Sequence, residues 1–248
     1  MQHVWVGCGQ EAQQLTLPEP TQEVFPGVPW GCASSPFSPA YWIARCSWPL
    51  EDASDFVTKD GSLTEELGFC LLGGFGIRYE VNTAAFERLR EKGVFSLECD
   101  FAMSEIEDLL LTPLMVDGRN VRYRFPRQRA RRLWKMREVL RASTISLDDP
   151  LSLRDELMEL EGVGPKTASW VVRNLLGSDQ VAILDVHIIR VCQRLGLFPR
   201  NVTLPRDYRK LEEIFLDFAS VAGVSSAQLD ATIWAEARTV PADAWRLT

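Results

Sequence analysis

The sequence has no closely spaced cysteines. Its six cysteines are scattered over 248 residues, no two form a Cys-x-x-Cys pair, and none follows Cys192. Zinc and iron–sulfur sites draw on grouped thiolates of that kind, so we expect no metal ion and no iron–sulfur cluster as a cofactor. We expect the thiols to be reduced and mainly buried.

The sequence also lacks an apolar run that could span a membrane. A spanning helix needs about 18 consecutive apolar residues, and the longest candidate is interrupted by Gly73, Gly74 and Gly76. The opening Met1-Gln2-His3 shows no basic segment followed by an apolar core, which argues against a secretory signal. We therefore expect a cytoplasmic, intracellular protein with no membrane partner.

Repeats, low-complexity segments and long linkers are absent as well. With 248 residues, 46% of them hydrophobic, the chain can bury a full core. One domain, or two closely packed subdomains, is the expected organisation, and we expect a monomer.

Positive charge is scarce in the whole sequence but concentrated in one segment. The formal net charge of −7 by itself argues against a nucleic-acid partner. Between Arg119 and Arg141, however, nine arginines and one lysine accompany the single acid Glu138, a local balance of +9. Such a segment suits a phosphate backbone, although a solvated helix held by salt bridges explains the charges equally well.

The pattern of apolar residues predicts a mainly α-helical fold. Ser38 before Pro39 offers an N-cap, Gly93 and Gly196 offer helix stops, and Ser225 or Ser226 caps the last helix. Alternating residues predict a small N-terminal strand pair, 3–6 with 13–17, and a further short strand at 121–125. Helices are predicted at 39–44, 64–72, 81–92, 104–111, 127–142, 151–160, 166–175, 186–195, 208–222 and 226–238.

The most informative segment is Leu-Glu-Gly-Val-Gly-Pro-Lys-Thr-Ala at 160–168, followed by Leu-Asp-Val-His at 184–187. Its two glycines permit a tight hairpin with exposed backbone amides, and Pro165 suits the first turn of the next helix. The amides of a helix N-terminus suit a phosphate. A lysine in the first turn, Lys166, is more often simply exposed to solvent when nothing else accompanies it.

The spacing between Lys166 and Asp185 supports a functional interpretation of both. About twelve helical residues carry the chain roughly 18 Å away from Lys166, and the extended stretch 178–184 covers roughly 23 Å on the return. Asp185 can therefore lie beside Lys166. An amine nucleophile must be neutral to attack, and a helix start inside a cleft disfavours the ammonium form.

Residues 151–195 closely, and residues 60–240 loosely, resemble the helix-hairpin-helix superfamily of DNA glycosylases, in particular the branch that includes the 8-oxoguanine DNA glycosylases. A glycine hairpin alone is common, but the hairpin, the lysine and the Asp-Val-His together are specific. The resemblance implies two helical subdomains. One comprises about 1–80 and 196–248, and the other about 81–195, with the hairpin motif at 151–177.

The resemblance also implies an activity. It is a DNA repair glycosylase with AP lyase activity that excises an oxidised purine, 8-oxoguanine, from double-stranded DNA containing a damaged base. Lys166 would form the Schiff base, and Asp185 would offset positive charge on the sugar while capping its own helix. The alternatives are a glycosylase of the same fold for another modified base, or a non-catalytic DNA-binding module, against which the Lys166 and Asp185 pair argues.

Further DNA contacts are implied by the same resemblance. The backbone of Gly162, Val163 and Gly164 would hold a phosphate, and related hairpins bind a monovalent cation through their carbonyl oxygens. His187 would contact another phosphate, with a partly buried structural histidine as the alternative. The basic segment would add electrostatic contacts, chiefly from Arg131 and Arg132.

Base extrusion requires a group that fills the vacated stack. The family's asparagine-rich wedge has no asparagine at the matching turn, 72–77, where Phe75 is the candidate, with a core anchor as the alternative. Gln128 stands in the place of an intercalating tyrosine. Arg129 retains the following arginine, a candidate partner for the base opposite the lesion.

The pocket for the extruded base is expected around the last helix. Trp234 occupies the place of a stacking phenylalanine, with core packing as the alternative, and Asp230 that of a glutamine reading the base. A carboxylate only accepts hydrogen bonds, which suits the donors of a guanine-type edge. Trp30 and Gly31 would contribute a backbone carbonyl to the same pocket.

Overall fold

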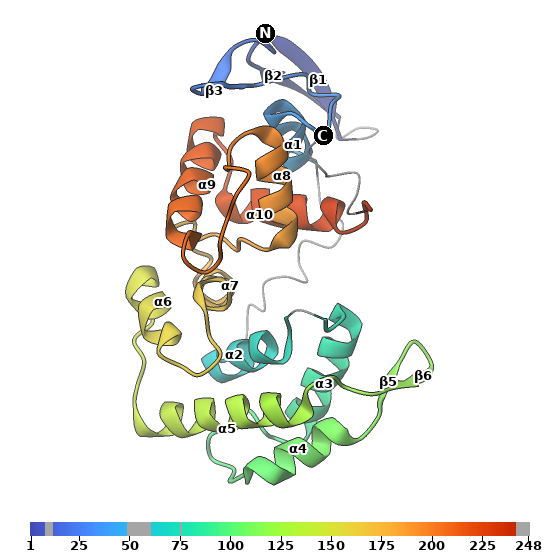
Figure 1. Cartoon of the computed structure of the whole chain (residues 1–248), viewed down its shortest axis with the longest axis vertical. Helices are drawn as coiled ribbons and strands as arrows, with labels where there is room; N and C mark the ends of the chain where they lie inside the picture. Colours follow the sequence, from blue (N-terminus) through green and yellow to red (C-terminus); the bar gives the residue numbers. More distant parts are fainter. Residues whose placement is uncertain (8–11, 49–60, 75, 242–248) are drawn as a thin grey trace. The chain divides into compact units, whose positions relative to one another are not determined.

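The computed structural model describes residues 1–7, 12–48, 61–74 and 76–241, and these form ten α-helices and three two-stranded antiparallel sheets (Figure 1). The predicted mainly α fold is confirmed, and the ends of the predicted helices differ from the observed ones by at most two residues. The helices are α1 (Pro39–Cys46), α2 (Leu63–Leu72), α3 (Tyr79–Glu91), α4 (Met103–Leu111), α5 (Pro126–Ala142), α6 (Pro150–Met158), α7 (Pro165–Leu176), α8 (Val186–Leu195), α9 (Tyr208–Ala222) and α10 (Ser226–Ala237).

Local signals determine where these helices begin and end. The Ser38 hydroxyl accepts a hydrogen bond from an amide in the first turn of α1, and Ser225 does the same for α10. Gly196 ends α8 with a φ of 81°, a left-handed conformation that glycine adopts without steric cost. Among the described residues, no helix has the length and apolar character needed to cross a membrane.

The N-terminal strand pair is confirmed, whereas the strand predicted at 121–125 is wrong. Strands β1 (Gln2–Val6) and β2 (Gln13–Leu17) pair antiparallel, and β3 (Glu23–Phe25) pairs with β4 (Val28–Pro29). The later hairpin joins β5 (Leu114–Val116) to β6 (Arg119–Val121), so only Val121 of the predicted strand belongs to a sheet. Tyr123 leaves the strand because its hydroxyl donates to the carbonyl of Leu72, and Phe125 is already the N-cap of α5.

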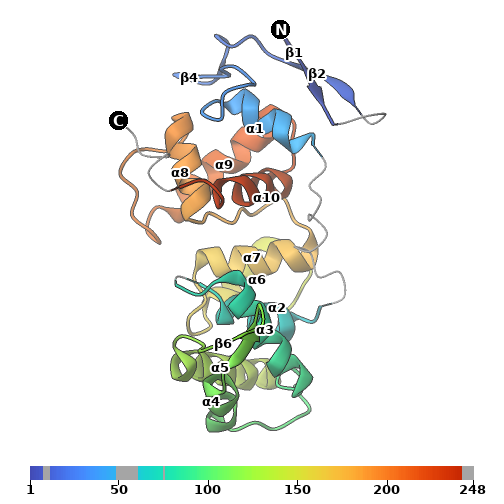
Figure 2. The same cartoon turned by 90° about the vertical axis from the view of Figure 1, so that its right-hand side faces the viewer.

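The chain divides into two compact units. The first unit comprises residues 1–57 and 177–248, and the second comprises 58–176. Helix α2 thus lies with the middle of the chain, because it packs against α7 and α5 (Figure 2). Residues 177–195 lie with the two ends, because α8 packs against α10. Both segments were assigned the other way by the boundaries expected from the sequence.

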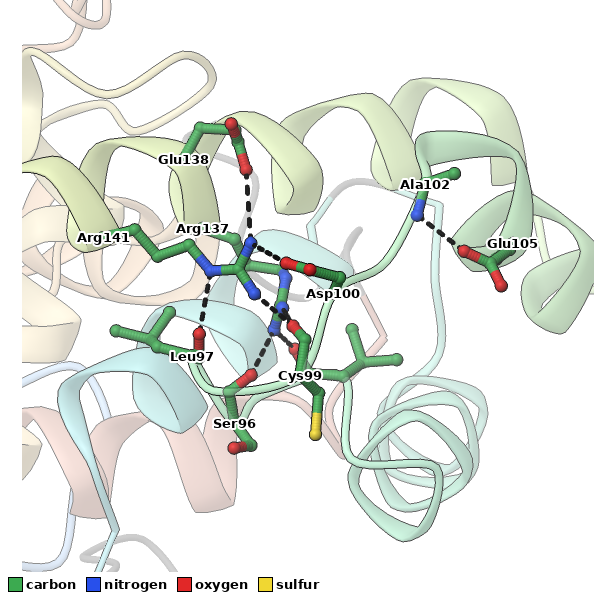
Figure 3. Close-up of polar contacts among 10 residues, drawn as sticks. Ser96, Leu97, Cys99, Asp100, Ala102, Glu105, Arg137, Glu138 and Arg141 are labelled. Atoms are coloured by element: carbon green, nitrogen blue, oxygen red, sulfur yellow. Dashed lines mark hydrogen bonds and ion pairs between the residues drawn. The ribbon is translucent and has the colours of Figure 1, made fainter.

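The second unit uses part of its basic segment internally. Arg137 of α5 is 1% exposed and donates to the carbonyl oxygens of Val94, Ser96 and Cys99 (Figure 3). Arg141, one turn later, donates to the Leu97 carbonyl at 2.8 Å and pairs with an aspartate of the same loop. These two cations therefore stabilise the loop between α3 and α4, and the cations nearer the start of α5 remain for other roles.

Candidate active site

The hairpin between α6 and α7 has the geometry that its glycines predict. The Val163 amide donates to the Leu160 carbonyl at 3.1 Å, which closes the turn. Gly162 has a φ of 88°, and a Cβ there would overlap the side chain of Arg132. The positive φ favours glycine, and a larger residue would also have to displace the Arg132 side chain. The carbonyl oxygens of Gly162 and Val163 accept no hydrogen bond from the described residues of this unit, and Gly164 leads into α7.

Helix α5 holds this hairpin by charge. The Glu161 carboxylate, immediately before Gly162, lies 2.9 Å from the Arg131 guanidinium and 2.6 Å from the Lys135 ammonium. Lys135 and then Arg131 hold the pKa of Glu161 below its ordinary value, so the carboxylate stays ionised near neutral pH. The predicted basic segment thus meets the hairpin, although Arg131 pairs with an acid and Arg132 packs on a glycine.

Lys166 lies in the first turn of α7, half-buried. Its Nζ is 5.7 Å from the centre of the Trp170 ring, one turn further along the helix, and that ring meets Phe69 of α2 edge to face. Among the described residues of the second unit, no acid forms an ion pair with Lys166. Its amine is thus held beside an aromatic ring without a carboxylate from its own unit.

The interface of α2 and α7 next to this lysine is charged but buried. Burial raises the pKa of the Cys70 thiol well above its ordinary value, Glu66 acts in the same direction, and Lys166 and Arg173 oppose them. Asn174 donates to the buried Glu66 carboxylate at 3.1 Å. The charge of Lys166 therefore acts on the Cys70 thiol at this interface.

Asp185 caps α8, as predicted. Its Oδ1 accepts hydrogen bonds from the amides of His187 at 2.8 Å and Ile188 at 3.0 Å, and the residue is 9% exposed. Its second oxygen, Oδ2, accepts none from the described residues of the first unit. One carboxylate oxygen thus fixes the side chain at the start of α8. His187 is half-buried beside it.

The extended segment before Asp185 is held by three side chains that the sequence analysis did not assign to this role. The Ala182 amide donates to Glu212, the Ile183 amide to Asp230, and the Leu184 amide to the hydroxyl of Tyr208. The same hydroxyl donates to the Ala182 carbonyl at 2.6 Å. The segment forms no sheet, so these contacts replace a strand partner and position Asp185.

A signal for this arrangement exists in the sequence. Glu212 and Asp230 occupy apolar positions of their helices, next to Leu211 and Leu229, and both are buried. Acids at core positions require internal donors, and the backbone amides of an unpaired extended segment are such donors.

The expected base-pocket residues have different surroundings. Trp234 is half-buried, and the Arg238 guanidinium lies 4.3 Å from the centre of its ring. The Trp30 carbonyl already accepts from the Ala40 amide, and the Gly31 carbonyl from the side chain of Gln2. The proposed pocket carbonyls are therefore hydrogen-bonded within the fold.

The residues considered for the wedge and for the contact to the opposite base differ in their exposure. Phe75 lies outside the described residues. Gln128 is exposed in the first turn of α5, but Arg129 is only 8% exposed and lies against Tyr123 and Gly74. Burial lowers the pKa of Arg129, and the neighbouring Tyr123 acts in the opposite direction.

A further aromatic side chain, Phe125, which the sequence did not suggest as a wedge, lies near the glycine turn. Phe125 is 43% exposed, adopts a left-handed φ of 65°, and stacks under the Arg124 guanidinium at 4.6 Å. Arg124 in turn lies against Gly76, so this aromatic adjoins the glycine turn. A bulky residue with positive φ is uncommon and is often found at functional sites.

Lys166 belongs to the second unit and Asp185 to the first. Their pairing, which the spacing predicts, therefore stays a prediction. Among the described residues, no group of three or more histidine, cysteine or acidic side chains is placed to hold a metal ion.

Comparison with known proteins identifies relatives of known activity. The 8-oxoguanine DNA glycosylase/AP lyase of Thermotoga maritima is 33% identical over 121 residues, 47% of this chain and 58% of that protein. The corresponding protein of Metallosphaera sedula is 32% identical over 47% of this chain and 59% of its own length. The chain thus aligns with little more than half the length of these relatives.

Solved structures share the fold. The structure of the Thermotoga maritima 8-oxoguanine DNA glycosylase matches with a TM-score of 0.53 and 28% identity, over 69% of this chain and 77% of that one. The Methanocaldococcus jannaschii 8-oxoguanine glycosylase/lyase, solved with a 15mer DNA containing 8-oxoguanine, matches with a TM-score of 0.51 and 24% identity over 69% of this chain and 78% of that one.

The family model described as 8-oxoguanine DNA glycosylase, of the helix-hairpin-helix type, matches residues 51–224. That range includes the hairpin, Lys166, Asp185 and the side chains of α9 that hold the segment between them. The chain therefore belongs to the helix-hairpin-helix family of 8-oxoguanine DNA glycosylases.

Proposed function

We propose that this protein excises 8-oxoguanine from double-stranded DNA and then cuts the strand, with Lys166 as the nucleophile. The observation that carries the proposal is the position of Lys166, which lies in the first turn of the helix after a glycine hairpin and forms no ion pair with the described residues of its unit. Membership of the glycosylase family and the names of its relatives support the same activity.

In this mechanism the neutral Lys166 amine attacks C1′ of the damaged nucleotide. The bond from C1′ to the base breaks, the base leaves with the electron pair, and the sugar opens to a Schiff base with the lysine. Water takes a proton from C2′, the C3′–O3′ bond breaks and the 3′ phosphate leaves with its electron pair, and hydrolysis of the C=N bond then frees the lysine. The free Oδ2 of Asp185 would stabilise the positive charge on the sugar.

The hairpin and Phe125 have separate roles in this proposal. The hairpin amides other than that of Val163, which closes the turn, and the amides at the start of α7 would bind a DNA phosphate. The open carbonyls of Gly162 and Val163 fit a monovalent cation, which would add positive charge facing that phosphate. Phe125, exposed beside the glycine turn, is the proposed wedge in place of Gln128.

The proposal is tested by excision from a panel of duplexes. Single-turnover release of 8-oxoguanine opposite each of the four bases, of an unrelated lesion, and of undamaged guanine would be measured. We expect release and strand cleavage from the 8-oxoguanine duplexes and none from the undamaged one. If only the unrelated lesion is released efficiently, that lesion and not 8-oxoguanine is the substrate. If the protein binds the duplexes but releases no base, it is a non-catalytic DNA-binding module.

A further inference from the structure

Glu161 is an acid in a place where a DNA-binding hairpin would be expected to avoid one. It directly precedes Gly162, whose backbone belongs to the proposed phosphate site. Its carboxylate is bracketed by Arg131 and Lys135, residues one turn apart on the same face of α5. Two cations thus meet one monoanion at the hairpin, and a DNA phosphodiester is also a monoanion.

The charges of this cluster are partly solvated. The side chain of Glu161 is one third exposed, and those of Arg131 and Lys135 are about half exposed. Such ion pairs are weak, because water and salt screen them and the long side chains lose freedom when they pair. A competing anion can therefore displace the carboxylate without breaking a buried contact.

We infer that Glu161 occupies a phosphate site in the free protein, and that a DNA phosphate takes Arg131 and Lys135 from it on binding. This inference rests on the proposed function and adds to it a residue, Lys135, and a restraint on affinity. While Glu161 is present, the two cations contribute less than their full charge to any duplex. The restraint acts on damaged and undamaged DNA alike, because a phosphate carries no sequence information.

Such a restraint helps an enzyme that must leave undamaged DNA quickly. Lower affinity for ordinary duplex shortens each unproductive encounter, whereas contacts to the extruded base act only at the lesion. Because the restraint acts on both kinds of duplex alike, Glu161 leaves the ratio of lesion affinity to non-specific affinity unchanged and shortens the time that the protein spends on undamaged DNA.

The test compares Glu161→Gln with Glu138→Gln. Both variants lose one negative charge, and Glu138 of α5 pairs with Arg141 (Figure 3). Affinity for an undamaged duplex would be measured over a range of salt concentrations, with the melting temperature of each variant as a control of folding. A third variant, Glu161→Gln with Lys135→Gln, restores the net charge of the cluster.

We expect Glu161→Gln to bind undamaged duplex about two- to fivefold more tightly at low salt. Its salt dependence should steepen by about one unit, because one further cation equivalent meets phosphate. Glu138→Gln should change neither by as much, and the double variant should return toward the parent. Parent-like or weaker binding by a folded Glu161→Gln protein would overturn the inference and make Glu161 a structural contact.

The outcome separates this inference from the proposed function. If the parent excises 8-oxoguanine but Glu161→Gln leaves affinity and salt dependence unchanged, only the role of Glu161 is wrong. If the parent neither binds duplex nor releases any base, both proposals fail together.

Discussion

The carboxylate of Asp230 accepts a hydrogen bond from the backbone amide of Ile183, with 3.2 Å between Oδ2 and the nitrogen. Asp230 is 3% exposed on α10, and Ile183 lies two residues before Asp185. The acid thus positions the segment that carries the proposed catalytic carboxylate. The sequence predicts a second role for Asp230, reading the edge of a base, and the following variants separate that prediction from the positioning role.

Replacing Asp230 by alanine should destabilise the first unit. The variant leaves the Ile183 amide without that acceptor, which costs about 1–3 kcal/mol in unfolding free energy. Asp230→Asn keeps an acceptor oxygen and should lose much less. Urea unfolding of both variants measures the difference, and equal stability of the alanine variant and the parent would contradict the positional role.

Excision rates of the Asp230→Ala variant and the parent test whether Asp230 also reads the base. If the carboxylate also accepts hydrogen bonds from a guanine-type edge, Asp230→Ala should slow release of 8-oxoguanine far more than release of an unrelated lesion. Equal slowing on both lesions would assign Asp230 to positioning alone.

Asp185→Asn should separate capping from catalysis. An asparagine oxygen still accepts from the amides of His187 and Ile188, so the melting temperature should stay close to that of the parent. Excision should slow by about 100- to 1000-fold, because an amide carries no charge to offset the positive sugar. Single-turnover rates that match the parent would show that the carboxylate has no part in the chemistry.

Phe125 and Gln128 are alternative candidates for the wedge, and their alanine variants should differ in affinity for a lesion duplex. Phe125→Ala should weaken binding to a lesion duplex by about tenfold, because the vacated stack loses its aromatic filler. Gln128→Ala should bind within about twofold of the parent, since its side chain is exposed on α5. Fluorescence of a base analogue opposite the lesion would report the insertion, and a larger effect from Gln128 would restore the assignment made from the sequence.

Gly162 and Gly118 form a matched pair for the hairpin. Both have positive φ, 88° and 71°, but an added Cβ overlaps Arg132 only at Gly162 and meets no atom within 4 Å at Gly118. Gly162→Ala should lower duplex affinity more than Gly118→Ala does, because the added methyl group also displaces the Arg132 side chain from the hairpin. If Gly118→Ala lowers affinity as much, the loss reflects strain and not the phosphate site.

Local signals explain why so much of the helical fold could be predicted. Caps such as Ser38 and Asp185, and the stop at Gly196, act within four residues, so the sequence carries them directly. The strand expected at 121–125 failed because Tyr123 bonds to a carbonyl 51 residues away, which overrides its strand propensity. The unit boundaries differ for the same reason, since they depend on which helices pack together.

The hairpin turn and the capping role of Asp185 could be predicted because each depends on neighbouring residues. The role of Lys166 stays a prediction. The supports of the segment before Asp185 could not be predicted in this way, because Tyr208, Glu212 and Asp230 approach it from two other helices. Phe125 was missed because its exposure and left-handed backbone depend on the turn in which it folds.

The identity of the nucleophile is tested most directly by borohydride trapping on a duplex containing 8-oxoguanine. Reduction of the Schiff base should yield a covalent complex whose DNA is attached to the peptide that contains Lys166. Lys166→Gln should fold and bind the same duplex but give no complex and no cleavage. A complex of parental yield with Lys166→Gln, or attachment at another lysine such as Lys135, would contradict the account.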